Sequence, residues 1–324
     1  MIYRAFGKTG WRVSQVGVGC WQFGGAITVD GKPDGWPNVS DEESAATIQR
    51  AVELGINFFD TSDMYGWGRS EEVLGRTLKK IGHPDRIHIA TKVGFWHDDR
   101  GGRTFNESKD YILRACDASL RRLQIDHIDL YQCHLWRTER WTEFLDAFET
   151  LQQQGKIGFY GVSTNDFDIV ERFDERKKLT AVQSRYSLLN RKAEREILPY
   201  CRGRGIAFIA RTPFARGRLS GRMTKDQKFD ADDIRSNWLE GGEREKFERD
   251  LDTVDRLKLI AEKYDLTVAE LAMKFVVTNP VVSTTIPGTR SRTQLEQNVA
   301  AGLLSPLTHE ELAAIDHVLV QPSP

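Results

Sequence analysis

The sequence lacks the features that mark several classes of protein. Its 324 residues carry a formal net charge of -1, so neither nucleic acid nor an anionic membrane is favoured as a partner. No apolar run approaches membrane-spanning length, and the N-terminus lacks the apolar stretch of a signal peptide. The 4 cysteines are widely separated and form no CxxC pair, which favours free thiols in a reducing compartment. We therefore expect a cytoplasmic protein without a metal site.

The composition is that of a globular protein with a sizeable core, because 40% of the residues are hydrophobic and 29% are charged. Short apolar runs alternate with amphipathic stretches, a pattern that predicts parallel strands joined by helices. We expect eight strands, at residues 16–19, 56–59, 87–90, 127–131, 157–162, 181–186, 206–210 and 281–286. Eight such units in a chain of this length predict an α/β fold of the closed (β/α)₈ TIM barrel type, in one domain covering residues 1–324.

Three segments lie outside these units. Residues 1–15 contain a turn between apolar segments and predict a β-hairpin, and a capping box at 308–311 predicts a C-terminal helix. Residues 222–245 are polar and charged, and we interpret them as a long loop. Further helix caps are expected at Ser40, Ser70, Ser108 and Ser291. The competing fold is a doubly wound open sheet, which usually has a G-x-G-x-x-G turn after its first strand. Residues 17–22 lack the third glycine of this motif, so we do not favour that fold.

Four side chains follow consecutive strands and should meet at the C-terminal rim of the barrel, where active sites of this fold lie: Asp60, Tyr65, Lys92 and His134. An ammonium group favours a neighbouring phenolate, so Lys92 should lower the pKa of Tyr65 and make it a proton donor near neutral pH. Asp60 would pair with Lys92, and His134 would orient a substrate oxygen. Alone, Asp60 would more often cap a turn and His134 would more often be a core residue; together the four predict carbonyl reduction.

Several motifs of the chain resemble those of the aldo-keto reductase family, in the same order and over essentially the whole length. They lie at residues 3–14, 58–66, 70–75 and 119–131. The resemblance implies a (β/α)₈ barrel, a nicotinamide cofactor bound without a Rossmann domain, and a catalytic tetrad. The tetrad falls on Asp60, Tyr65, Lys92 and His134, with no substitution.

The resemblance also implies cofactor-binding residues. At the nicotinamide these are Ser163, Gln183 and Arg211, while Thr164 stands where the family often has asparagine and Asn165 is its candidate substitute. Many members have an aromatic residue where this chain has Arg211, and a cation there would disfavour the oxidised, positive ring. Along the pyrophosphate the implied residues are Thr212, Pro213, Phe214, Gly217 and Arg222. At the adenosine end they are Gly288, Thr289, Arg290, Gln294 and Asn298.

Arg290 decides the expected coenzyme. No acidic residue lies between positions 281 and 295 to bind a free ribose hydroxyl, so we expect Arg290 to contact a 2′-phosphate. The sequence therefore predicts an NADPH-dependent reductase of an aldehyde or ketone, such as a sugar or another small carbonyl compound. The alternative is a cofactor-binding regulatory subunit that resembles potassium-channel β subunits. A hydrolase or isomerase on the same barrel would need a metal cluster or carboxylate pair, and neither is evident.

The substrate pocket is less defined. Aromatic residues just after strand ends could line it or simply pack the loops: Trp21, Trp67, Trp96 and Trp136. Four arginines lie in loops on the same rim: Arg100, Arg103, Arg137 and Arg140. They would be compatible with an anionic substrate, but we favour the interpretation that they are solvated surface residues.

Overall fold

The computed structural model describes residues 1–82, 84, 86–97 and 102–320. Eight parallel strands form one sheet in the order β14-β13-β12-β11-β10-β7-β6-β3. The two edges of this sheet meet, because isolated parallel bridges join Val16 to Thr285 and Gly19 to Gly288. The predicted (β/α)₈ barrel is therefore confirmed.

All eight strands lie where the apolar runs predicted them. Their bounds are Val18–Gly19 (β3), Phe58–Asp60 (β6), His88–Val93 (β7), Ile128–Cys133 (β10), Ile157–Ser163 (β11), Ala181–Arg185 (β12), Ala207–Arg211 (β13) and Val282–Ile286 (β14). Strands of a parallel barrel are covered on both faces, so even polar residues in them are buried. Every residue of β14, for example, is buried.

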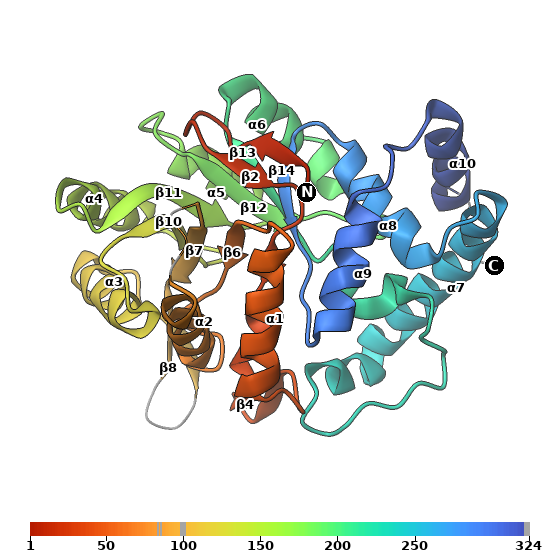
Figure 1. Ribbon diagram of the computed structural model, residues 1–324, viewed down its shortest axis with the longest axis horizontal. Helices are drawn as coiled ribbons and strands as arrows, with labels where there is room; N and C mark the ends of the chain where they lie inside the picture. Colours follow the sequence, from red (N-terminus) through yellow and green to blue (C-terminus); the bar gives the residue numbers. More distant parts are fainter. Residues whose placement is uncertain (83, 85, 98–101, 321–324) are drawn as a thin grey trace.

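Helices surround the barrel, with α1 to α4 on one side of the view in Figure 1 and α7 to α10 on the other. The α-helices are Asp41–Glu53 (α1), Arg69–Lys80 (α2), Lys109–Leu123 (α3), Trp141–Gln153 (α4), Phe167–Phe173 (α5), Ile197–Arg204 (α6), Gly241–Lys263 (α7), Val268–Thr278 (α8), Arg292–Gly302 (α9) and His309–Val320 (α10). Short 3₁₀ helices are Trp21–Gly24 (η1), Lys192–Glu194 (η2), Ala215–Ser220 (η3) and Ile234–Leu239 (η4).

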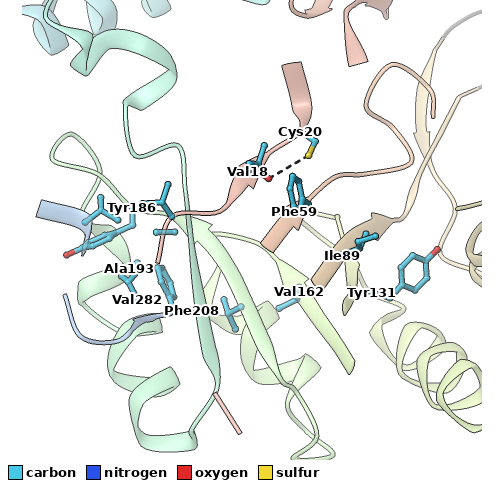
Figure 2. Packing of buried hydrophobic residues seen from close by; sticks show 14 of the residues in the cluster. Val18, Cys20, Phe59, Ile89, Tyr131, Val162, Tyr186, Ala193, Phe208 and Val282 are labelled. Carbon is cyan, nitrogen blue, oxygen red and sulfur yellow. Dashed lines mark hydrogen bonds between the residues drawn. The ribbon is translucent and has the colours of Figure 1, made fainter. Parts of the chain in front are cut away.

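One large hydrophobic cluster joins strands of the barrel to the helices around them. Figure 2 shows five of its members on five different strands: Val18, Phe59, Ile89, Val162 and Phe208. The predicted N-terminal hairpin is confirmed as β1 (Tyr3–Ala5) and β2 (Arg12–Ser14), which pair antiparallel. Its Phe6 packs on Phe58 of β6, with ring centroids 5.3 Å apart, and its Trp11 stacks on His88 at the start of β7. The hairpin thus covers the N-terminal end of the barrel and leaves the opposite end for a site.

The helix caps are mostly as expected. The side chains of Ser40, Ser108 and Ser291 accept hydrogen bonds from backbone N–H groups of α1, α3 and α9. The capping box of α10 is confirmed: Glu311 N donates to Thr308 Oγ1, and Thr308 N donates to Glu311 Oε2. The predicted cap at Ser70 is wrong, because α2 begins one residue earlier. The Ser70 hydroxyl instead donates to the Cys20 carbonyl oxygen, which ties α2 to the loop after β3.

The prediction of a loop over 222–245 is wrong in its C-terminal half, where η4 forms and α7 begins. The reason is a separate hydrophobic cluster in which Trp238 of η4 packs against Phe247 and Leu251 of α7. A polar segment with few apolar residues does not reveal such a cluster, because its partners lie further along the chain.

Two further hairpins rise from the loops after β3 and β7. They are β4 (Ala26–Val29) with β5 (Lys32–Gly35), and β8 (Phe95–His97) with β9 (Arg103–Phe105). In Figure 1, β4 and β8 lie at the bottom of the view and β2 at the top, so these hairpins are at the end of the barrel opposite the N-terminal hairpin. They are linked by an ion pair of 3.3 Å between Arg103 Nη1 and Asp34 Oδ2.

All four cysteines are buried free thiols. Within the described residues, no helix is both long and apolar enough to cross a membrane.

Candidate active site

Asp60 and Lys92 form a buried ion pair at the C-terminal ends of β6 and β7. Lys92 Nζ donates hydrogen bonds to Asp60 Oδ2 at 2.6 Å, to the Thr61 carbonyl oxygen at 2.7 Å and to the Tyr65 hydroxyl at 3.3 Å. The side chains of Lys92 and Asp60 are 0% and 2% exposed. The ammonium group therefore has all of its protons directed at acceptors, one of which is the phenol of Tyr65.

The parallel register explains why these groups meet. In the parallel register, Asp60 of β6 is the partner of Ala90 of β7. Lys92, two residues after Ala90, is the partner of Gln132 of β10. Gln132 and Gln183 donate from their side-chain amides to Asp60 Oδ1, at 3.2 and 2.7 Å. Both carboxylate oxygens are thus hydrogen-bonded, as a buried charge requires.

Tyr65 lies on the loop between β6 and α2, which packs closely against η1. A Cβ on Gly24 would lie 2.7 Å from the carbonyl carbon of Tyr65, and one on Gly66 would lie 2.2 Å from the carbonyl oxygen of Gly24. Gly66 also has a φ of 61°, which disfavours other residues. These two glycines allow the loop to hold Tyr65 against Lys92.

Burial and charge act in opposite directions on Tyr65. Burial raises the pKa of Tyr65, and Lys92 lowers it through its charge and its hydrogen bond. Burial outweighs the ammonium group, so the pKa is above its ordinary value and the expected net lowering is wrong. Burial would also lower the pKa of Lys92, but Asp60 and Tyr65 raise it above its ordinary value. Lys92 therefore remains positively charged beside the phenol.

His134 directly follows β10, and its backbone N–H donates to the Val93 carbonyl oxygen at 2.9 Å. Its ring meets Tyr65 and Phe95 edge-on, with centroid distances of 5.8 and 5.2 Å. Burial lowers the pKa of His134 well below its usual value, and Lys92 and Arg103 are among the cations that lower it further. The imidazole is therefore neutral at physiological pH and donates from one nitrogen only.

A cavity of about 860 Å³ opens above these residues, and Asp60, Tyr65 and His134 line it. Lys92 lies beneath it, behind Tyr65. Of the expected cofactor residues, those that line the cavity are Ser163, Gln183, Arg211, Thr212, Pro213, Phe214, Gly217, Arg222, Gly288, Arg290, Gln294 and Asn298. Thr289 is buried, and its hydroxyl donates to the Ser291 carbonyl oxygen and not into the cavity.

At the expected nicotinamide end, four polar side chains form two hydrogen-bonded pairs. Ser163 Oγ donates to Gln183 Oε1 at 3.3 Å. Asn165 Oδ1 accepts from Arg211 Nη2 at 3.1 Å, so Asn165 orients the guanidinium. Thr164, by contrast, uses its hydroxyl to accept from Asp166 N. Burial lowers the pKa of Arg211 to about 9, with Arg185 acting in the same direction.

At the expected adenosine end, Arg290 precedes α9. Its backbone N–H donates to Gln294 Oε1 at 2.9 Å, and its guanidinium lies 5.8 Å from the centroid of the Trp36 ring. Asp233, from a distant part of the sequence, approaches this end, but its carboxylate is engaged by Arg235 at 2.6 Å. Burial and then Arg235 lower the pKa of Arg290. The local field is therefore positive, which suits an anionic group.

Of the expected substrate-pocket residues, two line the cavity and two pack elsewhere. Trp21 and Trp136 line the cavity, with Trp136 50% exposed. Trp96, on β8, instead packs edge-on against Tyr111, at 5.3 Å between ring centroids. Trp67 packs against the main hydrophobic cluster.

The arginines expected at the rim have different environments. Arg100 lies outside the described residues. Arg103 lines the cavity but is paired with Asp34. Arg140 pairs with Glu143 on α4.

Four arginines that line the cavity were missed by the sequence analysis: Arg185, Arg216, Arg218 and Arg235. Arg216 lies with its guanidinium 5.5 Å from the centroid of the Trp21 ring, and Arg185 ends β12. Burial lowers the pKa of Arg216 to about 10, and Arg185 adds to the effect. Within the described residues, neither Arg216 nor Arg211 forms an ion pair. For Arg216 and Arg218, the density of arginine between positions 211 and 222 was the available signal.

The described residues contain no group of three or more His, Cys, Asp or Glu side chains that could hold a metal ion.

This chain belongs to the aldo-keto reductase family, since the model of the Aldo/keto reductase family matches residues 15–320. It is 32% identical over 300 residues to the aldo-keto reductase YhdN of Bacillus subtilis (strain 168), covering 91% of this chain and 87% of that protein. It is also 32% identical over 267 residues to a Schizosaccharomyces pombe protein named aldo-keto reductase yakc NADP(+), covering 81% of this chain and 78% of that one.

Solved structures agree with this assignment. The aldo-keto reductase AKR11C1 from Bacillus halodurans, in a holo form, superposes with a TM-score of 0.79 and 31% identity, covering 98% of this chain and 96% of that one. Both the predicted family and the predicted fold are thus confirmed. Members of the family typically reduce carbonyl compounds with a nicotinamide cofactor.

Proposed function

We propose that this protein is an NADPH-dependent reductase that converts an aldehyde or ketone to an alcohol, with Tyr65 as general acid. The observation that carries the proposal is the position of the Tyr65 hydroxyl at the floor of the cavity. It lies 3.3 Å from Lys92 Nζ, which in turn lies 2.6 Å from Asp60. A phenol with a fixed ammonium group behind it can release its proton toward the cavity and be stabilised as the phenolate.

A reduced nicotinamide, when bound, supplies the hydride. Tyr65 then donates its proton to the oxygen that becomes the alcohol, and Lys92 stabilises the phenolate that remains. Asp60 keeps Lys92 charged through their buried pair. The neutral His134 donates a hydrogen bond to the same substrate oxygen and orients it.

The residues of the cavity fit a pyridine nucleotide. Arg211 Nε is buried and has no hydrogen-bond partner among the described residues, as expected of a donor that serves a bound molecule. Arg290, Gln294 and Asn298 line the same cavity and would hold the adenosine end. The name of the Schizosaccharomyces pombe relative and the positive field at Arg290 support NADPH over NADH.

The substrate is proposed to be a small carbonyl compound, such as a sugar, that enters beside Trp21 and Trp136. The test follows NADPH oxidation with a panel of aldehydes, ketones and sugars, and NADP⁺ reduction with the matching alcohols. Turnover of any carbonyl compound that is lost in Tyr65→Phe supports the proposal. Tight NADPH binding without turnover across the panel would favour a regulatory subunit.

A further inference from the structure

Ser62 connects His134 to a second carboxyl group, Asp63, on the loop after β6. Ser62 Oγ lies 3.1 Å from His134 Nδ1 and 3.2 Å from Asp63 Oδ1. It also accepts a hydrogen bond from the Met64 backbone N–H at 3.3 Å. Ser62 is buried, so no bulk water replaces these partners.

The number of protons in this chain of groups restricts its arrangement. The Ser62 hydroxyl has one proton and can donate to only one of its two side-chain neighbours. If it donates to Asp63, then His134 must donate from Nδ1 to Ser62, and Nε2 has no proton. If it donates to His134 Nδ1, then Nε2 carries the proton, and Asp63 satisfies Ser62 best by donating a proton of its own.

We propose that Ser62 and Asp63 are positioning residues that select the tautomer of His134. A protonated Asp63 donates to Ser62, Ser62 donates to His134 Nδ1, and the imidazole keeps its proton on Nε2. Since Nδ1 is turned toward Ser62, Nε2 is on the side of the ring that is free for the cavity. The consequence for catalysis rests on the proposed function, because only a donor at Nε2 can hold a carbonyl oxygen.

The charges around Asp63 favour its protonated form near neutral pH. Burial raises the pKa of Asp63 to about 8, and the nearby Glu71 contributes, while Arg122 opposes the shift. Arg122 is mainly committed to Glu71, with 2.6 Å between Nη2 and Oε2. The phenols of Tyr111 and Tyr131, which also face Asp63, have raised pKa values and remain neutral.

The charges around His134 keep the ring neutral throughout. Burial lowers its pKa, and the positive groups Lys92, Arg211 and Arg103 lower it further. The imidazole therefore changes tautomer and not charge when Asp63 titrates. As pH rises through the pKa of Asp63, the carboxylate attracts the Ser62 proton, Nδ1 becomes the donor, and the population with a proton on Nε2 falls.

The experiment measures the tautomer directly by nitrogen-15 NMR of the full-length, histidine-labelled protein between about pH 6 and pH 10. A His134→Gln variant assigns the signals. The wild type should show the Nε2–H tautomer at the low end and conversion toward Nδ1–H near the pKa of Asp63. Asp63→Asn, whose amide donates but does not ionise, should keep the Nε2–H tautomer over the whole range. The exposed Asp126→Asn is the matched control and should titrate like the wild type.

Ser62→Ala should abolish the pH dependence of the tautomer, and Ser62→Thr, which retains a hydroxyl, should restore it. One hydrogen bond contributes about 0.5–1.5 kcal/mol, so kcat of Ser62→Ala should fall roughly two- to tenfold with NADPH affinity unchanged. If the His134 tautomer is independent of pH in the wild type, or titrates unchanged in both Ser62→Ala and Asp63→Asn, the inference is wrong. The NMR signal needs no turnover, so the test remains valid if the proposed reductase activity fails.

Discussion

The floor and the mouth of the cavity are built in different ways. The floor carries Asp60, Lys92 and His134 at the ends of neighbouring strands, with the two charges buried against each other. The mouth is built from loops and hairpins, where Arg103 and Asp34 pair at partial exposure and Trp136 is half exposed. Strand register leaves the floor little freedom, whereas loops can change without disturbing the barrel. We infer that the reaction type is set at the floor and the choice of substrate at the mouth.

The charge balance differs as well. The floor is internally neutral, since Lys92 and Asp60 compensate each other. Arg211, at the expected nicotinamide end, and Arg216 also line the cavity, and burial lowers their pKa values to about 9 and about 10. Buried cations without a carboxylate partner are costly, and an anionic ligand would remove that cost. For Arg216, which lies within the expected pyrophosphate segment, the pyrophosphate of a dinucleotide is such a ligand.

The largest effect is expected at the floor. Tyr65→Phe removes the proposed acid and little volume, and general acid catalysis is typically worth roughly 10²–10⁴ in rate, so kcat should fall by about that factor. NADPH affinity, measured by fluorescence titration, should barely change. Tyr160→Phe removes an equally buried hydroxyl from β11, outside the cavity, and should leave kcat intact. Near-full activity of Tyr65→Phe would refute the assignment.

The second effect concerns the charge beneath Tyr65. Lys92→Met removes the group that lowers the pKa of Tyr65, so this pKa should rise further and the acid should weaken. We expect kcat to fall roughly ten- to hundredfold, with the alkaline limb of the pH–rate profile moved to higher pH. Asp60→Asn should weaken catalysis in the same direction by leaving Lys92 unpaired.

The matched control for this pair is Lys274→Met. Lys274 is another buried lysine in an ion pair: it lies on α8, and its Nζ is 2.6 Å from Glu311 Oε1 on α10. Its loss should lower the melting temperature and leave the pH–rate profile unaltered. An unchanged profile in Lys92→Met, Asp60→Asn and the double variant would show that the pair does not tune Tyr65.

The third effect is at the far end of the cavity. A hydrogen bond to a charged group is worth about 1.5–3 kcal/mol, so Arg290→Ala should weaken NADPH binding by roughly ten- to a hundredfold and leave NADH binding nearly unchanged. The loss should shrink at high salt because Arg290 is partly exposed. The exposed Arg292→Ala on α9 is the control. Equal losses for both cofactors would mean that Arg290 shapes the loop.

The smallest effect is expected at the mouth. Aromatic contacts are worth about 0.5–1.5 kcal/mol, so Trp136→Ala should raise KM for apolar or sugar aldehydes by roughly two- to tenfold and leave kcat unchanged. Trp96→Ala removes a tryptophan of similar exposure, 47% against 50%, that packs on Tyr111 outside the cavity, and KM should stay constant. Initial-rate kinetics on both variants test this. A drop in kcat for Trp136→Ala would contradict the inference that the mouth affects only the choice of substrate and the floor sets the reaction type.

The features that could be predicted are those that depend on residues close together in the sequence. Most barrel strands begin as short apolar runs, and Asp60 and Lys92 lie at the ends of two of them. The N-terminal hairpin and the capping box at Thr308 and Glu311 depend on residues within a few positions of each other. Ser70 was misassigned because its hydroxyl bonds to Cys20, which is distant in the sequence.

The features that were missed depend on packing between remote segments. The β4–β5 and β8–β9 hairpins contain glycine, proline and charged residues that are typical of loops. Arg103 links them, because its side chain pairs with Asp34 and its backbone N–H donates to Asp30 Oδ1. The helix η4 forms because Trp238 finds Phe247 on α7. Arg216 enters the cavity through a turn in which its own φ is 57°, which no periodic pattern predicts.

The sequence by itself determined the barrel, the family and the four residues at the floor, because strand periodicity and parallel register convert positions along the chain into positions at one rim. Only the tertiary structure decided how these residues act on each other. Burial raises the pKa of Tyr65 above the value that Lys92 alone would produce, and the loop after β6 brings Ser62 and Asp63 to His134. Desolvation and hydrogen-bond geometry depend on what surrounds a group in space, and that information is absent from local sequence.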